Sequence, residues 1–327
     1  MALDKTKIRK LFDEMVYIRM VEDFIADNYF IKGKFQEMRC PVHLSTGQEA
    51  VSVGVMAHLK KKDLIFCTHR SHGHYIAKGG SLKKMFAEIY GKETGCVGGV
   101  GGSMHLQDLN NGVFVSIPIV GSVIPLSVGS ALSNKLLKKN HKNVVFFGDG
   151  ALEEGSWHES AEFAILNNLK IVFVCENNLY SVYTPLHQRQ INNKLERFAK
   201  SHCIKVFECD GNNVEDVYKA SKLGLDYSEN KDEPVFILAH TYRHREHCGP
   251  NFDDHLNYRS KKEIKYWFDK DPIKKYEKFL KQSKIIDDMY IKRLEKKISR
   301  KIIDSNNFAL HSKLPHKDSA KRYVYAK

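Results

Sequence analysis

Two short polar motifs, each directly after an apolar segment, contain the residue types that bind a hard metal ion. Gly148-Asp149-Gly150 follows the apolar segment 144–147, and Asn177-Asn178 follows the segment 171–175. A carboxylate and an amide oxygen suit Mg²⁺, which keeps near-octahedral oxygen coordination and is commonly bound together with phosphates. The two glycines leave the backbone free for a tight turn and for close approach of a phosphate-bearing ligand. The pair of motifs therefore predicts a site for a metal ion and a diphosphate.

The motifs can form one site only if the elements that carry them are neighbours in a sheet. Each apolar run is typical of a buried strand, and an amphipathic helical segment separates the two runs. If the strands are parallel, both motifs lie at carboxyl ends of neighbouring strands, where open α/β sheets bind their ligands. Either motif alone is more often an ordinary turn. Their combination, with one helix between two buried strands, favours the site.

The remaining sequence alternates between helical and extended patterns. Residues 98–102 form a glycine-rich loop, and we expect a further loop from there to Pro118. The alternation predicts an α/β fold with a parallel sheet and helices on both faces. Helices are expected over 5–32, 47–59, 81–90, 125–138 and 214–227, and strands over 63–68, 144–148, 171–175, 205–209 and 234–240.

Composition excludes several classes of protein. With 327 residues, 42% hydrophobic and 28% charged, the chain reads as a globular protein that buries a large core. The longest apolar candidate for a membrane span, 113–126, is interrupted by Pro118 and Pro125. The first 20 residues show no secretory signal and contain acidic groups that argue against a transit peptide. Seven cysteines without a C-x-x-C pair favour reduced thiols, so we expect a cytoplasmic protein that does not bind membranes.

The net charge of +13 raises the alternative of a nucleic-acid-binding protein. Much of the excess lies in 261–303, where apolar residues nevertheless recur at helical spacing: Ile291, Leu294, Ile298 and Ile302. A helix with a solvated, lysine-rich face explains this segment better than a nucleic-acid surface. We therefore expect an α/β domain over 1–272, followed by a helical C-terminal arm over 273–327.

Further short motifs occur on both sides of the two metal-binding motifs. They are 43–50 (HLSTGQEA), 70–73 (RSHG), 101–105 (GGSMH), 241–243 (TYR) with His247, and Tyr258-Arg259. In this order, and together with the two metal-binding motifs, they resemble over about residues 11–279 the alpha subunit of thiamine-diphosphate-dependent 2-oxoacid dehydrogenases of the pyruvate, acetoin and branched-chain type. The resemblance implies the thiamine-diphosphate-binding fold, with thiamine diphosphate and Mg²⁺ as cofactors.

The resemblance also implies roles for individual residues. The side chains of Asp149 and Asn178 match two metal ligands, and the backbone carbonyl of Tyr180 matches the third. Arg70 and Arg243 match arginines that bind the cofactor diphosphate, a task that suits the bidentate guanidinium group. Positions that line the cofactor match Val120, Gly150 and Ala151.

Histidines occupy the remaining matched positions. His43 and His247 match family histidines near the reacting centre, where an imidazole with a pKa of about 6.5 can transfer protons. His69 stands where the family commonly has a tyrosine beside the diphosphate, which alters one expected cofactor contact. A zinc cluster of His240, His244 and His247 is not expected, because no cysteine or acidic partner follows at zinc-like spacing.

The implied function is that of a subunit, not of a whole enzyme. An alpha subunit decarboxylates a 2-oxoacid, or cleaves acetoin, and passes the acyl group to a lipoyl carrier, with the cofactor as electron sink. In this family the glutamate that activates the cofactor belongs to a beta subunit. Expected partners are thus a beta subunit in an alpha–beta heterotetramer, a lipoyl acyltransferase component and a small 2-oxoacid. The loop 244–254 leaves open a two-subunit carboligase or transketolase-like enzyme that acts on an aldehyde or sugar.

Overall fold

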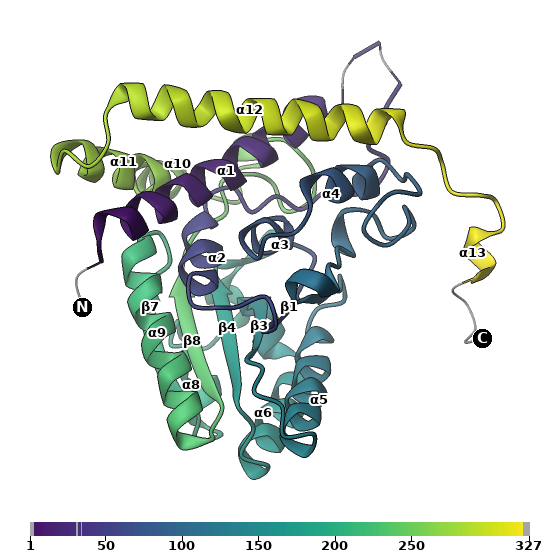
Figure 1. Cartoon of the computed structure of the whole chain (residues 1–327). Helices are drawn as coiled ribbons and strands as arrows, with labels where there is room; N and C mark the ends of the chain where they lie inside the picture. The colour runs from purple at the N-terminus through teal and green to yellow at the C-terminus, as the bar shows by residue number, and fades with distance from the viewer. Residues whose placement is uncertain (1–2, 31, 34, 323–327) are drawn as a thin grey trace.

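A six-stranded sheet forms the centre of the computed structural model, which describes residues 3–30, 32–33 and 35–322 (Figure 1). The strand order is β2-β1-β3-β4-β8-β7, and every neighbouring pair is parallel. The predicted α/β fold with a parallel sheet is therefore confirmed. The strands are β1 (Leu64–Cys67), β2 (Val113–Ser116), β3 (Asn143–Gly148), β4 (Ile171–Asn177), β7 (Lys205–Asp210) and β8 (Val235–His240).

The two central strands are apolar along nearly their whole length because helices cover both of their faces. Along β3, Val144 and Phe146 pack into one core cluster, and Val145 and Phe147 pack into the other. The register pairs Gly148 of β3 with Glu176 of β4. The segments that follow β3 and β4 therefore leave the sheet at the same edge.

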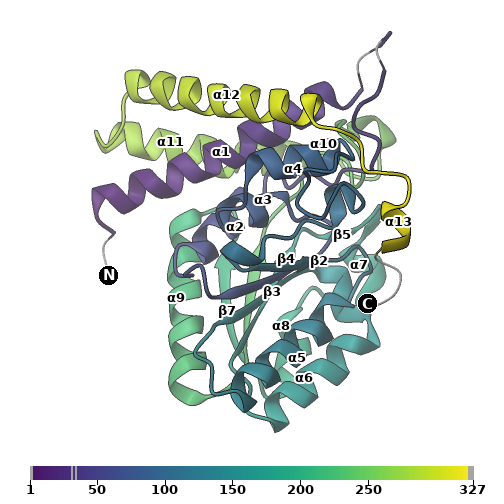
Figure 2. The ribbon, with the colours of Figure 1, turned by 45° about the vertical axis from the view of Figure 1, so that its right-hand side comes forward.

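Two layers of helices enclose the sheet (Figure 2). The first core cluster joins one face of the sheet to α1, α2, α3, α4 and α9, and the second joins the other face to α5, α6 and α8. The helices are α1 (Lys5–Tyr29), α2 (Glu49–Met56), α3 (His72–Ala77), α4 (Leu82–Ile89), α5 (Val123–Leu136), α6 (Gly155–Leu166), α7 (Leu186–Arg189), α8 (Glu196–Lys200) and α9 (Val214–Lys231).

The C-terminal part of the chain is helical, as predicted, and α12 lies across α1 and α4 (Figure 1). Ile298, Ile302 and Ala309 of α12 are buried in the same core cluster as α1, which explains their helical spacing in the sequence. The boundary proposed at residue 272 remains a prediction. The elements are α10 (Lys261–Asp269), α11 (Pro272–Gln282), α12 (Asp288–His311) and α13 (Ser319–Arg322).

One prediction of local structure was wrong, and several short elements were missed. The expected loop before Pro118 contains β2, an edge strand of four residues that is too short to show a clear alternation pattern. The helix α3 was missed because its six residues, HGHYIA, carry two buried histidines in place of an apolar stripe. The segment after Asn178 contains α7 and a small hairpin of β5 (Tyr180–Ser181) and β6 (Thr184–Pro185).

No helix among the described residues has the length and apolar character needed to cross a membrane.

Candidate active site

A cavity of about 170 Å³ lies at the carboxyl-end edge of the sheet. Ten of the residues singled out in the sequence line it: His43, His69, Arg70, Val120, Asp149, Gly150, Ala151, Asn178, Tyr180 and His247. Arg243 was expected to contact a cofactor but is not part of this lining. Gly148, which the sequence analysis placed in the turn beside Asp149, also lines the cavity, and no role was assigned to the other lining residues, which are Gln48, Thr68, Met104, Pro118, Glu176, Ser181 and Val182.

Asp149 is positioned by the end of β3 and begins a short 3-10 turn, Asp149–Glu153. Its carboxylate is buried, with 1% of the residue exposed, and forms an ion pair with Arg189 of α7. Burial raises the pKa of the Asp149 carboxyl, and the neighbouring Arg189 guanidinium opposes that rise. The site thus already places a positive charge against this carboxylate.

Asn178 follows β4 and is held on both sides of its amide group. The Asn178 Nδ2 donates to Oε1 of Gln48 at 3.3 Å, and the backbone N–H of Tyr180 donates to Asn178 Oδ1 at 3.3 Å. Gln48 is a contact that the sequence analysis missed, although it belongs to the HLSTGQEA motif. Asp149 and Asn178 lie on one cavity, as their positions at neighbouring strand ends predicted.

The glycines beside Asp149 differ in what they permit. A Cβ on Gly150 would lie 3.1 Å from the Ser181 Oγ, so a side chain here would press on the hairpin. Gly148 has an ordinary extended backbone and a Cβ would meet nothing within 4 Å, so only an incoming ligand would require a glycine at this position. A buried carboxylate, an amide oxygen and a glycine-flanked turn fit a divalent cation that carries a phosphate group.

Arginine side chains border the other wall. The Arg70 Nη1 donates to the Leu44 carbonyl at 2.5 Å and its Nη2 donates to the His247 carbonyl at 3.3 Å. Burial and the Arg243 charge lower the pKa of Arg70 to about 9. Arg243 itself donates to the Val182 carbonyl at 3.1 Å and to the Tyr258 hydroxyl at 3.0 Å. Arg243 therefore braces the loops around the cavity and adds positive charge from outside its lining.

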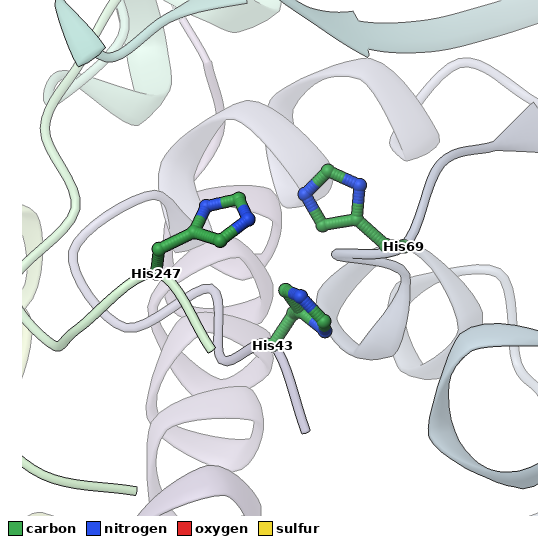
Figure 3. Close-up of side chains that lie close together, drawn as sticks. All are labelled: His43, His69 and His247. Atoms are coloured by element: carbon green, nitrogen blue, oxygen red, sulfur yellow. The ribbon is translucent and has the colours of Figure 1, made fainter. Parts of the chain in front are cut away.

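Three histidine rings meet between these walls (Figure 3). The ring centroids of His43 and His69 are 4.6 Å apart, and His247 lies 5.1 Å from His43 and 5.3 Å from His69. Burial, followed by the charge of Arg70, lowers the pKa of His43 to about 3, of His69 to about 2 and of His247 to about 3. At neutral pH all three rings are uncharged, so each presents one lone pair and one N–H. The sequence analysis weighed a different trio, His240, His244 and His247. Among the described residues these three do not form a group that could bind a metal ion.

A buried ion pair lies beside the cavity and was not recognised in the sequence. Glu176, the residue before the Asn177-Asn178 motif, lies 3.3 Å from His74 Nε2 of α3, and both residues are buried. Burial lowers the pKa of His74, but the charge of Glu176 together with hydrogen bonds to Cys67 and Glu176 raises the pKa to about 10. The only sequence signal was an acidic residue at the end of an otherwise apolar strand.

Fold and site together define an α/β protein with a polar ligand cavity at the carboxyl ends of parallel strands. Residues 13–318 match the family described as the dehydrogenase E1 component, and the chain belongs to this family. The resemblance identified from the motifs is thereby confirmed.

Named relatives are similar along nearly their whole length. The chain is 36% identical over 320 residues to the alpha subunit of acetoin:2,6-dichlorophenolindophenol oxidoreductase of Bacillus subtilis, covering 98% of this chain and 93% of that protein. It is 32% identical over 331 residues to the pyruvate dehydrogenase E1 component subunit alpha of Porphyra purpurea, covering 99% and 94%. The corresponding subunit of Rickettsia bellii is 30% identical over 321 residues, covering 98% and 96%.

Proposed function

We propose that the chain is the alpha subunit of a 2-oxoacid dehydrogenase that depends on thiamine diphosphate and Mg²⁺. The observation that carries the proposal is the meeting of Asp149 and Asn178 on one cavity with Arg70 on its border. Oxygen donors for a divalent ion and a fixed positive charge are what a diphosphate needs. The names of the relatives support the same class of reaction, on pyruvate or acetoin.

In this proposal the metal is held by Asp149, Asn178 and the carbonyl of Tyr180. Arg70 contacts the diphosphate directly, whereas Arg243 supports it through charge and through the loops that it braces. When bound, thiamine diphosphate supplies the electron sink for loss of CO₂ from the 2-oxoacid. Val120, Gly150 and Ala151 surround the cofactor as lining residues.

The histidines act on protons and on the substrate. His43 and His247 are neutral at working pH because burial and Arg70 lower the pKa of both rings. The His43 Nδ1 is buried without a hydrogen-bond partner among the described residues, so it is free to bind a substrate group. A neutral imidazole in this position accepts a hydrogen bond from a substrate hydroxyl or donates its single N–H to a substrate oxygen. His69 takes the place of the tyrosine expected beside the diphosphate.

The proposed partners follow from the same assignment. A beta subunit completes the active site in an alpha–beta heterotetramer, and a lipoyl acyltransferase component receives the acyl group. The substrate is a small 2-oxoacid such as pyruvate, or acetoin. We place the complex in the cytoplasm, where the seven free cysteines would stay reduced. No feature of the described residues favours the carboligase or the nucleic-acid alternative over this proposal.

The test is co-expression with a candidate beta chain, followed by two measurements. The first is the shift in melting temperature on addition of thiamine diphosphate with Mg²⁺, and the second is reduction of an artificial electron acceptor with pyruvate, acetoin or branched 2-oxoacids. We expect a stabilised complex and turnover that requires both chains. An unchanged melting temperature would contradict the cofactor assignment, and full turnover by the alpha chain alone would contradict the proposed partnership.

A further inference from the structure

The three histidines of the cavity come from three distant segments and face one point. His43 precedes α2, His69 follows β1, and His247 lies in the loop after β8. One ring nitrogen from each lies within 4.8 Å of the other two, and Figure 3 shows the rings turned toward a common gap. The fold therefore gathers three nitrogen donors at a single position.

Among the described residues, no side-chain or backbone hydrogen bond holds the rings of His43, His69 and His247. The buried His43 Nδ1 has no hydrogen-bond partner within the described part of the chain, and the rings of His43, His69 and His247 contact one another. His58 shows the ordinary arrangement, with its Nε2 2.9 Å from the Tyr218 carbonyl. Buried polar atoms are normally satisfied, so the unpartnered His43 Nδ1 is consistent with a site for a ligand that the structure does not contain.

A positive charge beside the three rings weakens their attraction for a cation. Arg70 lines the same cavity as the three histidines. Arg70 faces the same group, and Glu22 and Glu176 act on Arg70 with the opposite charge. We therefore expect a site of moderate strength that can be occupied and vacated.

We infer that His43, His69 and His247 form a second metal site, for a borderline divalent ion such as Zn²⁺. Imidazole nitrogens suit Zn²⁺ and Co²⁺, whereas Mg²⁺ prefers oxygen ligands such as those of Asp149 and Asn178. Tetrahedral Zn–N bonds of about 2.0–2.1 Å require nitrogens about 3.4 Å apart, so the rings must move slightly inward. Three protein ligands leave a fourth position open toward the cavity. Binding of Zn²⁺ does not depend on the proposed function and can be measured without turnover.

The experiment uses Co²⁺ as a spectroscopic probe and Zn²⁺ as its competitor. The full-length chain is titrated in excess Mg²⁺, so that oxygen ligands are already occupied. We expect one Co²⁺ per chain with a visible absorption band, displaced by Zn²⁺ but not by further Mg²⁺. His69→Tyr should weaken binding at least 10-fold because tyrosine supplies no ring nitrogen.

A surface histidine provides the matched control. His158 and His202 lie 3.0 Å apart on the surface, next to Glu162, and are the obvious competing site. His202→Gln should leave the Co²⁺ affinity unchanged. Loss of binding in that variant, or unchanged binding in His69→Tyr, would overturn the inference. X-ray absorption of the wild-type Zn²⁺ form gives a test without variants, since it should count three imidazole ligands, and one or none would exclude the site.

Discussion

The cavity residues His43, His69 and His247, which we call the histidine wall, and the Glu176–His74 pair both contain buried or partly buried imidazole rings. Their histidines nevertheless have opposite protonation states. Burial lowers the pKa of an imidazole in both places. Beside Arg70 the neighbouring charge acts in the same direction, and the pKa of His43 falls to about 3. Beside Glu176 the opposite charge and the hydrogen bonds to Cys67 and Glu176 together exceed the effect of burial, and the pKa of His74 rises to about 10. Neighbouring charges and hydrogen bonds therefore decide the protonation state, and burial alone does not.

Asp149 and Asn178, which we call the oxygen wall, line the same cavity. The pKa of the Asp149 carboxyl likewise depends on both burial and a neighbouring charge. Burial raises the pKa of Asp149, and Arg189 limits that rise. One edge of the sheet thus combines neutral nitrogen donors with charged oxygen donors within a single cavity. This division allows two kinds of cation to be distinguished, because hard ions choose oxygen ligands and borderline ions choose nitrogen ligands.

The largest effect should come from Asp149→Ala. The variant removes a proposed metal ligand itself. Mutation of a residue that only hydrogen-bonds to a metal ligand costs about 10- to 100-fold in activity, so we expect the activity of the assembled enzyme to fall at least about 100-fold. The stabilisation by thiamine diphosphate with Mg²⁺ should disappear as well, as measured by melting temperature. Asp232→Ala is the control, because Asp232 pairs with Lys170 at the surface. If thiamine diphosphate with Mg²⁺ raised the melting temperature of Asp149→Ala as much as that of the wild type, the assignment of Asp149 as a metal ligand would be contradicted.

Glu176→Gln should have the largest effect on stability. The variant leaves His74 buried without its charged partner, which typically destabilises a protein by about 3 kcal/mol. Glu208→Gln is a matched control, because Glu208 lies 3.3 Å from His240 in a pair whose side chains are 41% and 47% exposed. That pair should contribute less than about 1 kcal/mol. Equal losses in urea unfolding for the two variants would contradict the comparison.

The pH dependence of Glu176→Gln carries a definite sign. The folded-state pKa of His74, about 10, lies above its unfolded value, so its contribution is fully present below about pH 6.5 and is lost as the pH rises through about 10. Wild-type stability should therefore fall over this alkaline range, and the variant should show a flatter profile. Urea midpoints measured from pH 7 to pH 10 would reveal the difference.

The division between the two walls explains which parts of the site were readable in the sequence. Asp149 and Asn178 were found because each follows an apolar strand, and strand order alone brings them to one edge. His43 and His247 were singled out only through motif resemblance. The meeting of His69 with them depends on three loops, and the pairing of Glu176 with His74 depends on the packing of α3, which the sequence pattern did not reveal.

The fold shows a similar limit. Long buried strands such as β4 were predicted nearly to the residue because their apolar runs are continuous. The edge strand β2 and the hairpin of β5 and β6 were not, since short elements draw their stability from neighbours and not from their own pattern. The loop residues that line the cavity, such as Ser181 and Val182, depend on these short elements and were missed with them.

A smaller effect is expected for His69→Tyr, on acid stability. The pKa of His69 in the folded protein, about 2, lies below its unfolded value. The unfolded chain therefore takes up a proton as the pH falls below about 6.5, and wild-type stability declines toward acid pH. At pH 5 the variant should recover about 1–2 kcal/mol of this loss. His255→Gln, a change of an exposed histidine, should leave the profile of urea midpoints unaltered, and an unchanged acid profile in His69→Tyr would show that the ring is not held neutral.

The smallest effect should come from Arg189→Gln, which tests whether Arg189 competes with a divalent ion for the Asp149 carboxylate. The guanidinium pairs with Asp149 and therefore competes with a divalent ion for the same carboxylate. At pH 8 its removal should lower the Mg²⁺ concentration needed for cofactor binding by about 3- to 10-fold, which corresponds to the net contribution of about 0.5–1.5 kcal/mol of one typical hydrogen bond. At lower pH the gain should shrink, because the pKa of Asp149 then rises without Arg189 and protons compete with the metal. Arg197→Gln is the control, since Arg197 bonds to Gln190. Weaker Mg²⁺ binding by Arg189→Gln at pH 8 would mean that this arginine supports the cofactor instead of competing with its metal.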